Sequence, residues 1–404
     1  MLNWTTQFSG RTARMQASEI RELLKLLDDP NILSFAGGIP DPELFPAEAF
    51  RSAYGEVLSD DRSGQALQYA VSEGFAPLRR WIAGYMARFG IDCGIDNIMI
   101  TSGSQQALDY LGKLFLSPGD TALVGWPTYL GALQAFNAYE PTYARLEPFG
   151  NETPEALRAA AEAVGGAVKF AYTTPDFANP TGETLSVAAR VRLLEQAEAL
   201  DCAVIEDAAY QALRYSGEDV APILKLDIDR SGHIDATRTI FCGSFSKTLS
   251  PGLRLGWVVA AKPVVQRLVL IKQAADLNTS AVNQMVMARV AETIFDEQVE
   301  RIRTAYGHRL ESMLQALRDF MPEGVTWNEP DGGMFVWVRL PEGQDCAELL
   351  KASVRDIQVA FVPGKAFFAD GSGANYLRLN FSLLKPERIR EGMERLGKLI
   401  ASRL

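Results

Sequence analysis

The sequence predicts an α/β fold in which a large domain, built on a mainly parallel sheet covered by helices, is followed by a smaller α+β domain. Short apolar runs alternate with segments of helical periodicity from about residue 96 to residue 260, a pattern typical of strands joined by crossover helices. After about residue 290, long charged helical segments and a few non-consecutive strands replace that alternation. The length of 404 residues exceeds what one hydrophobic core usually serves, which favours two domains.

We expect three regions along the chain. Residues 1–45 form an N-terminal arm and helix that contribute to the small domain and the substrate side, residues 46–290 form the large domain, and residues 291–404 form the small domain. No internal repeat, low-complexity tract or flexible linker stands between them. The two domains are therefore expected to pack closely against each other.

The expected elements follow in chain order. A first helix is expected over 18–27, before Asp28-Asp29-Pro30 ends it. Strands of the large domain are expected at 97–100, 122–125, 168–172, 203–206, 239–242 and 255–260, with helical segments near 153–164 and 186–200. The small domain is expected to hold a charged helix over 297–319, strands at 334–338, 359–362 and 376–381, and a closing helix through Ile389 and Ile400.

Composition excludes several classes of function. The chain is 47% hydrophobic and 22% charged, as in ordinary globular proteins, and its net charge of −10 argues against nucleic acid or an anionic membrane as a main partner. The first residues lack the apolar core of a signal peptide, and no run of 18 apolar residues occurs, so we expect a cytoplasmic protein without a membrane span. The four cysteines are scattered without a CxxC pair and there are two histidines, so no metal site is expected.

The stretch from Gly243 to Arg254, GSFSKTLSPGLR, suggests a cofactor site. It lies between two apolar runs that are predicted to be strands, so its lysine, Lys247, would be held at a strand end. Ser244, Ser246 and Arg254 could hold a phosphate through hydroxyl hydrogen bonds and a charge-assisted clamp. A lysine beside a phosphate site suggests pyridoxal phosphate, whose aldehyde forms a Schiff base with a protein lysine. Taken alone, Lys247 is better explained as a solvated loop lysine, so the prediction depends on the rest of the chain.

Other polar and aromatic residues follow predicted strands or lie in turns, where α/β proteins place ligands. Asp207 could hold a proton on the ring nitrogen of pyridoxal, and Tyr210 and Asn179 could bond its ring oxygen. Tyr129 could stack on the ring, and Ser104 lies at a strand-to-helix junction suited to an anion. Each also has an ordinary interpretation: Asp207 and Ser104 as helix caps, Asn179 as a turn residue, and Tyr129 as a core aromatic.

These motifs, in this order, resemble those of a known family. The segments GSQQ, WPTY, FANPTG, EDAAY, GSFSKTLSPGLR and NYLRLNF resemble the fold-type I pyridoxal-phosphate-dependent aminotransferases of class I/II, over nearly the whole chain from Ser18. The N-terminal segment IRELLKLLDDPNILSFAGGIPDPELFP is most similar to that of the 2-aminoadipate and multi-substrate aminotransferases. The resemblance implies a seven-stranded, mainly parallel sheet and a homodimer with shared active sites.

The resemblance also implies a role for each matching residue. Lys247 would carry the cofactor and move a proton, Asp207 would pair with the ring nitrogen, and Arg378 would bind the α-carboxylate of the substrate. Gly38 would line the substrate side. The remaining cofactor contacts implied are Ser104, Gln105, Tyr129, Asn179, Tyr210, Ser244, Ser246 and Arg254, with Tyr69 reaching the phosphate from the partner subunit.

The expected activity is transfer of an amino group from an L-amino acid to a 2-oxo acid such as 2-oxoglutarate by a ping-pong mechanism. The donor would be of the 2-aminoadipate, glutamate, leucine or aromatic type, and Arg21 on the N-terminal helix could bind a distal carboxylate or be a solvated arginine. Two alternatives remain: a carbon–sulfur β-lyase that uses the same site, and an effector-sensing domain without catalysis.

Overall fold

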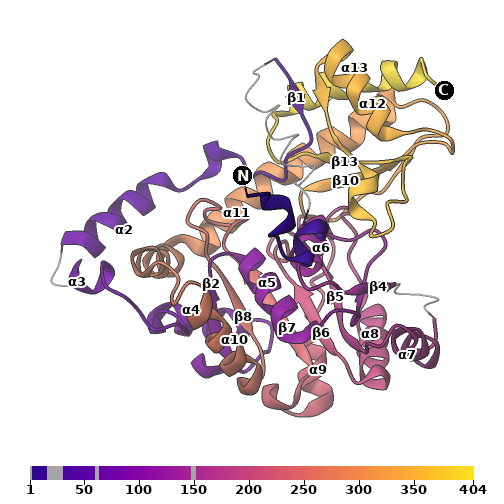
Figure 1. Cartoon of the computed structure of the whole chain (residues 1–404). Helices are drawn as coiled ribbons and strands as arrows, with labels where there is room; N and C mark the ends of the chain where they lie inside the picture. The colour runs from indigo at the N-terminus through magenta and orange to yellow at the C-terminus, as the bar shows by residue number, and fades with distance from the viewer. Residues whose placement is uncertain (1, 16–30, 60–62, 147–151) are drawn as a thin grey trace.

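The computed structural model describes residues 2–15, 31–59, 63–146 and 152–404. The predicted first helix at 18–27, together with Arg21, therefore lies outside the described residues. The described chain folds around a central sheet that carries helices on both faces, with a second layered unit formed mainly by C-terminal residues beside it (Figure 1).

A seven-stranded sheet, as expected, forms the centre of the larger unit. Its strands lie in the order β2-β8-β7-β6-β5-β3-β4, and only β8 runs antiparallel to its neighbours. The strands are β2 (Ile98–Thr101), β3 (Thr121–Val124), β4 (Thr142–Arg145), β5 (Val168–Thr173), β6 (Ala203–Asp207), β7 (Thr239–Ser244) and β8 (Gly256–Val259).

Six of these strands confirm the expected ones, within two residues at each end. Strand β4 was not expected, because its side chains are exposed or half-buried and it lies at the edge of the sheet. An edge strand has one paired side and little apolar surface to bury, so it leaves no continuous apolar run in the sequence.

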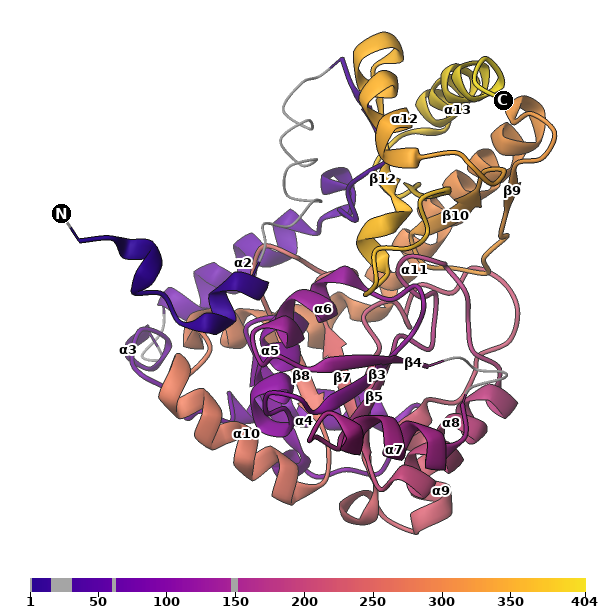
Figure 2. The same ribbon diagram turned by 45° about the vertical axis from the view of Figure 1, so that its right-hand side comes forward.

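Alternating side chains attach helices to the two faces of the sheet. Met99, Tyr172 and Ile205 pack on one face against α5, α6 and α10, whereas Ile98 and Val204 face the helices of the other side. The helices are α2 (Ala47–Ser59), α3 (Ser63–Ala66), α4 (Ala76–Ala87), α5 (Ser104–Phe115), α6 (Leu130–Asn137), α7 (Pro154–Ala163), α8 (Val187–Leu200), α9 (Ile223–Ser231) and α10 (Lys262–Ala275). Figure 2 shows α7, α8 and α9 grouped at one end and α10 at the other.

The smaller unit contains a four-stranded antiparallel sheet of order β12-β13-β10-β9, packed against helices. The chain at Leu33–Ser34 joins the smaller unit, since β1 pairs in parallel with β11. The elements are β1 (Leu33–Ser34), α11 (Ala281–Phe320), β9 (Thr326–Trp327), β10 (Phe335–Arg339), α12 (Cys346–Ala352), β11 (Val359–Ala360), β12 (Val362–Pro363), β13 (Tyr376–Asn380) and α13 (Pro386–Ala401).

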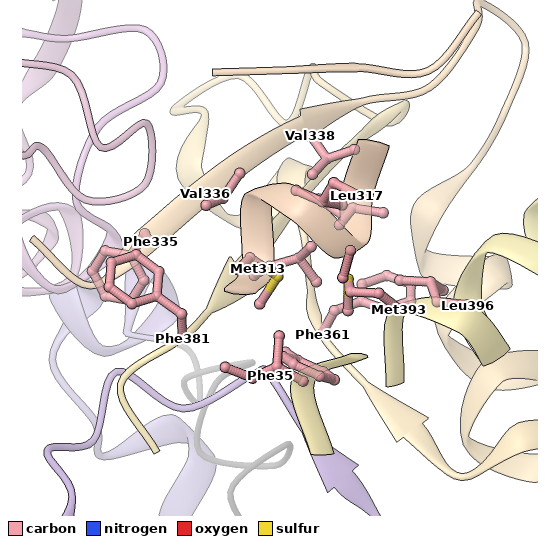
Figure 3. Close-up of a cluster of buried hydrophobic side chains, with 14 of the residues drawn as sticks. Phe35, Met313, Leu317, Phe335, Val336, Val338, Phe361, Phe381, Met393 and Leu396 are labelled. Atoms are coloured by element: carbon pink, nitrogen blue, oxygen red, sulfur yellow. The ribbon is translucent and has the colours of Figure 1, made fainter. Parts of the chain in front are cut away.

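The expected strand over 359–362 is wrong in one respect. Two short strands, β11 and β12, replace it and belong to different sheets, with Phe361 between them. Phe361 is fully buried in the apolar core of the smaller unit (Figure 3), so the side chain anchors the point at which the chain changes sheets. A continuous apolar run cannot reveal such a change, because both strands are buried.

The proposed domain limits at 45 and 290 stay predictions. Helix α11 passes through residue 290: its first part packs with α2 and α4, and its last part packs with α13 in the core that Figure 3 draws around Met313 and Leu317.

No helix among the described residues is long and apolar enough to cross a membrane. The described residues also contain no cluster of three or more His, Cys, Asp or Glu suited to a metal ion.

Candidate active site

The candidate site lies at the carboxyl ends of the parallel strands of the central sheet. Asp207 is the last residue of β6, and Lys247 follows β7 by three residues. Ser104 is the first residue of α5, after β2, and Tyr129 immediately precedes α6, after β3. Because parallel strands end at the same edge, the topology gathers residues from four separate stretches of sequence at one place.

Lys247 is partly buried, and its amine is held by the N-terminal segment. Lys247 Nζ donates a hydrogen bond to the backbone oxygen of Gly38 at 2.8 Å and lies 5.9 Å from the centre of the Tyr210 ring. Burial lowers the pKa of Lys247 to about 8, and the positive charges of Arg378 and Arg254 contribute to this shift. A lower pKa leaves more of the neutral, nucleophilic amine near neutral pH.

The carboxylate of Asp207 has one occupied and one free oxygen. Its Oδ2 accepts a hydrogen bond from the Tyr172 hydroxyl at 2.8 Å, whereas Oδ1 is buried without a partner among the described residues. Burial raises the pKa of Asp207 to about 6, and the Tyr172 hydroxyl, the Ala209 backbone N–H and Lys247 oppose that rise. A buried acceptor without a partner is costly, so this oxygen is suited to a ligand that donates a hydrogen bond, above all a cationic one.

Arg378 is a buried cation with no carboxylate partner among the described residues. It donates from Nη1 to Asn179 Oδ1 at 2.7 Å and from Nη2 to the Ala36 backbone oxygen at 2.6 Å, and its Nε has no partner in the described part of the chain. Its guanidinium carbon lies 4.2 Å from the centre of the Phe335 ring. Burial lowers the pKa of Arg378 to about 10. A buried guanidinium without a counter-charge is suited to bind an anionic ligand.

Asn179 and Tyr210 meet in the same place, as the sequence led us to expect. The Asn179 side chain, besides accepting from Arg378, hydrogen-bonds the Tyr210 hydroxyl. Both residues are buried. Burial also raises the pKa of Tyr210 well above that of a free tyrosine, so the hydroxyl stays protonated and can donate.

The start of α5 forms a cradle for an anion. Gly103, with φ +80°, precedes the helix, and a Cβ added there would clash with the guanidinium of Arg254. The Arg254 side chain thus lies against the helix N-terminus, where backbone N–H groups and the helix dipole favour negative charge. Ser246 donates its backbone N–H to Ser244 Oγ at 3.0 Å, which folds the turn after β7 beside them.

Gln105 and Tyr129 contact each other at the same helix start. The Tyr129 hydroxyl donates to Gln105 Oε1 at 3.4 Å, and Gln105 Nε2 donates to the Gly131 backbone oxygen at 2.6 Å. Two sequence-predicted residues stand apart from this group. The Tyr69 side chain is 80% exposed rather than enclosed with the others, and Arg21 lies outside the described residues.

The residues present fit pyridoxal phosphate. Lys247 has a lowered pKa, Asp207 keeps a free buried oxygen for a protonated ring nitrogen, and the α5 cradle suits a phosphate. Tyr172, which bonds Asp207, was not singled out by the sequence analysis, and neither were Ala36 and Phe335, which contact Arg378. Fold and site together define a fold-type I enzyme that uses this cofactor.

Comparison with known proteins identifies the family. The model of the aminotransferase class I and II family matches residues 38–396. The chain is 43% identical to an aromatic-amino-acid aminotransferase of Thermococcus litoralis, covering 99% of this chain and 95% of the relative, and 42% identical to a 2-aminoadipate transaminase of Thermus thermophilus, covering 99% and 98%. The structure of an α-aminoadipate aminotransferase from Thermus thermophilus, complexed with N-(5'-phosphopyridoxyl)-L-leucine, superposes with a TM-score of 0.88 at 40% identity, covering 99% of each chain.

The chain therefore belongs to the aminotransferase class I and II family, and it is an aminotransferase.

Proposed function

We propose that this enzyme transfers the amino group of an L-amino acid of the 2-aminoadipate, glutamate, leucine or aromatic type to a 2-oxo acid such as 2-oxoglutarate, by a ping-pong mechanism. The observation that carries the proposal is the placement of three groups: the Lys247 amine, the free oxygen of Asp207 and the unpaired guanidinium of Arg378. The names of two relatives support aromatic and 2-aminoadipate donors, and the complex of a solved relative with N-(5'-phosphopyridoxyl)-L-leucine supports leucine.

Each of these side chains has a distinct task in the proposal. Bound pyridoxal phosphate supplies an electron sink and carries the amino group between the two half-reactions. Lys247 would hold it covalently, and the Lys247 amine would move the proton of the substrate α-carbon. Asp207 keeps the ring nitrogen protonated, and Arg378 binds the α-carboxylate and so orients the α-carbon.

The remaining site residues bind and orient. Asn179 and Tyr210 would bond the ring oxygen of the cofactor, and Tyr129 would stack on the ring. The α5 cradle would hold the phosphate through residues that the sequence analysis named: Ser104, Gln105, Ser244, Ser246 and Arg254. Gly38 lines the substrate side, where its backbone oxygen receives Lys247.

Arg378 also argues against a decarboxylase. A carboxylate held by a buried guanidinium stays on the substrate, because its loss would leave that cation unpaired again. A carbon–sulfur β-lyase would keep the same carboxylate contact, so substrate tests rather than Arg378 separate that alternative from amino transfer.

We also propose a homodimer with shared active sites. Leu67, Tyr69 and Val71 form an exposed apolar stretch, with 75%, 80% and 59% of their respective surfaces accessible. Large apolar side chains this exposed and this close together are typical of surfaces that another protein covers. In the dimer, Tyr69 would reach the phosphate held by the partner. A cytoplasmic location remains a prediction.

A panel of amino donors tests the proposed activity. The purified enzyme is incubated with 2-oxoglutarate and each of 2-aminoadipate, glutamate, leucine, an aromatic amino acid and cysteine, and the formation of glutamate or a labelled equivalent is measured. We expect 2-oxo acids to form in proportion to the amino group transferred. Release of sulfide, ammonia and pyruvate from cysteine, without glutamate formation, would instead support the β-lyase.

A further inference from the structure

Tyr172 reaches the candidate site from the neighbouring strand. It lies in β5 next to β6, opposite Ile205, and its side chain is fully buried. Its ring packs edge-on against Phe136 in the core, with 5.6 Å between ring centres, and its hydroxyl lies 2.8 Å from Asp207 Oδ2. The sheet register and the core packing thus fix the position of the Tyr172 hydroxyl beside the carboxylate.

This donor makes the two oxygens of Asp207 unequal. A carboxylate that accepts one hydrogen bond at Oδ2 cannot rotate freely, and its Oδ1 is left without a partner among the described residues. A hydrogen bond to the charged form of an acid also favours that form over the neutral one. The hydroxyl therefore does two things at once: it orients the free oxygen and it opposes the effect of burial on ionisation.

We propose that Tyr172 is a positioning residue that keeps Asp207 ionised and turned so that its free oxygen meets the protonated ring nitrogen of the cofactor. This inference rests on the proposed function. Thr174 Oγ1 lies 3.5 Å from the Tyr172 hydroxyl and is a second side-chain oxygen beside it.

Other groups near Asp207 are consistent with this role. Burial raises the pKa of Tyr172 well above that of a free tyrosine, and the negative charge of Asp207 adds to the rise. Tyr172 therefore stays a neutral donor. Burial likewise keeps Tyr129, Tyr210 and Cys242 neutral, and raises the pKa of each. The Tyr172 hydroxyl lowers the pKa of Asp207 more than Lys247 does, and Lys247 is the cation among these neighbours.

The variant Tyr172→Phe removes one oxygen and keeps the ring. Loss of the Tyr172 hydroxyl should raise the pKa of Asp207, so that a smaller fraction of Asp207 is ionised as the pH falls through about 6. We measure the dissociation constant of pyridoxal phosphate, and the pH midpoint of the visible absorbance of the bound cofactor, from about pH 5.5 to pH 8. The control is Tyr143→Phe, which removes a hydroxyl that bonds Asn137 and the Leu133 backbone away from Asp207.

We expect the ratio of the dissociation constants, variant over wild type, to rise from roughly threefold or less near pH 8 to about tenfold below pH 6, as a pKa shift of about one unit implies. The control should show a ratio that does not change with pH. A pH-independent ratio for Tyr172→Phe would overturn the inference and leave the proposed function standing. Failure of the wild-type protein to bind the cofactor would overturn both.

A second variant covers the case in which Tyr172→Phe does not fold. Incorporation of 3-fluorotyrosine at position 172 keeps the hydroxyl and makes it a stronger donor. The inference then predicts the opposite change, with tighter cofactor binding than wild type below about pH 6. Weaker or unchanged binding at that pH would contradict it.

Discussion

Strand β6 ends in two adjacent buried carboxylates that face opposite sides of the sheet, and the two have different surroundings. Glu206 is fully buried, and its two oxygens accept the backbone N–H groups of Ile223 and Leu224, at the start of α9, at 2.8 Å each. Asp207, on the side of the candidate site, has one oxygen bonded by Tyr172, and its other oxygen has no partner in the part of the chain that the structure describes.

The comparison shows that hydrogen bonding distinguishes the two acids better than their pKa values do. Burial raises both pKa values, that of Glu206 to about 7 and that of Asp207 to about 6. A perturbed pKa alone would therefore select Glu206 at least as strongly. Glu206 is satisfied by the N-terminus of a helix, which is a structural arrangement, whereas Asp207 keeps an oxygen for a ligand.

The largest effect on activity is expected from Asp207→Asn. A neutral amide cannot hold the ring proton by charge, and losing a charge-assisted contact costs roughly 1.5–3 kcal/mol, so the turnover rate should fall at least about tenfold. Folding should be kept, because the amide fills the same space. Rates are measured on enzyme with a verified cofactor content, and near-normal turnover would contradict the role of Asp207.

Glu206→Gln should change stability and leave the activity of loaded enzyme close to normal. Because the pKa of Glu206 is raised from 4.5 to about 7 in the folded state, the folded protein binds this proton more tightly than the unfolded chain. The wild type should therefore lose up to about 3 kcal/mol relative to the variant as the pH rises through that window. Urea unfolding at several pH values measures the free energy of unfolding of wild type and variant. If the difference between the two did not change with pH, the raised pKa of Glu206 would be contradicted.

Tyr69 tests whether the exposed stretch belongs to a shared site. Lys247→Ala and Tyr69→Ala homodimers should each be impaired, and mixing them should form heterodimers in which one of the two sites is intact. Equal mixing with free exchange should restore about one quarter of wild-type activity. A fully active monomer in solution would refute the shared site.

The smallest effect is expected from Arg21→Ala, whose position lies outside the described residues. If Arg21 binds a distal carboxylate, the change should weaken turnover of glutamate or 2-aminoadipate from a few-fold to about tenfold and spare leucine and aromatic donors. Rates for the four donors are compared in the same preparation. Equal losses for all four would show that Arg21 does not select the substrate.

Sequence reasoning located the strand-end residues because each follows a buried apolar run. Asp207 ends such a strand, and Lys247 and Asn179 lie in the turns after β7 and β5, so their place at the carboxyl ends of the strands follows from the topology of parallel strands. Strand β4 was not predicted because an edge strand buries little apolar surface. The break at Phe361 was not predicted because the strands on both sides of it are buried.

Long-range contacts could not be predicted in the same way. Tyr172 stands within an apolar run, where an aromatic residue indicates core packing, and only the register between β5 and β6 places its hydroxyl beneath Asp207. The hydrogen bond from Lys247 to Gly38 spans 209 residues of sequence, and Arg378 reaches Asn179 across 199. Such pairs depend on how the two units pack, which local patterns do not encode.

The central claim is that Lys247 carries the cofactor at the carboxyl ends of the central strands, beside the free oxygen of Asp207. The most direct test is borohydride reduction of the purified holoenzyme, followed by proteolysis and mass spectrometry. The account predicts that the pyridoxyl mass is found on Lys247, in the peptide containing GSFSKTLSPGLR. Label on another lysine, or no covalent label in protein that retains the cofactor, would contradict it.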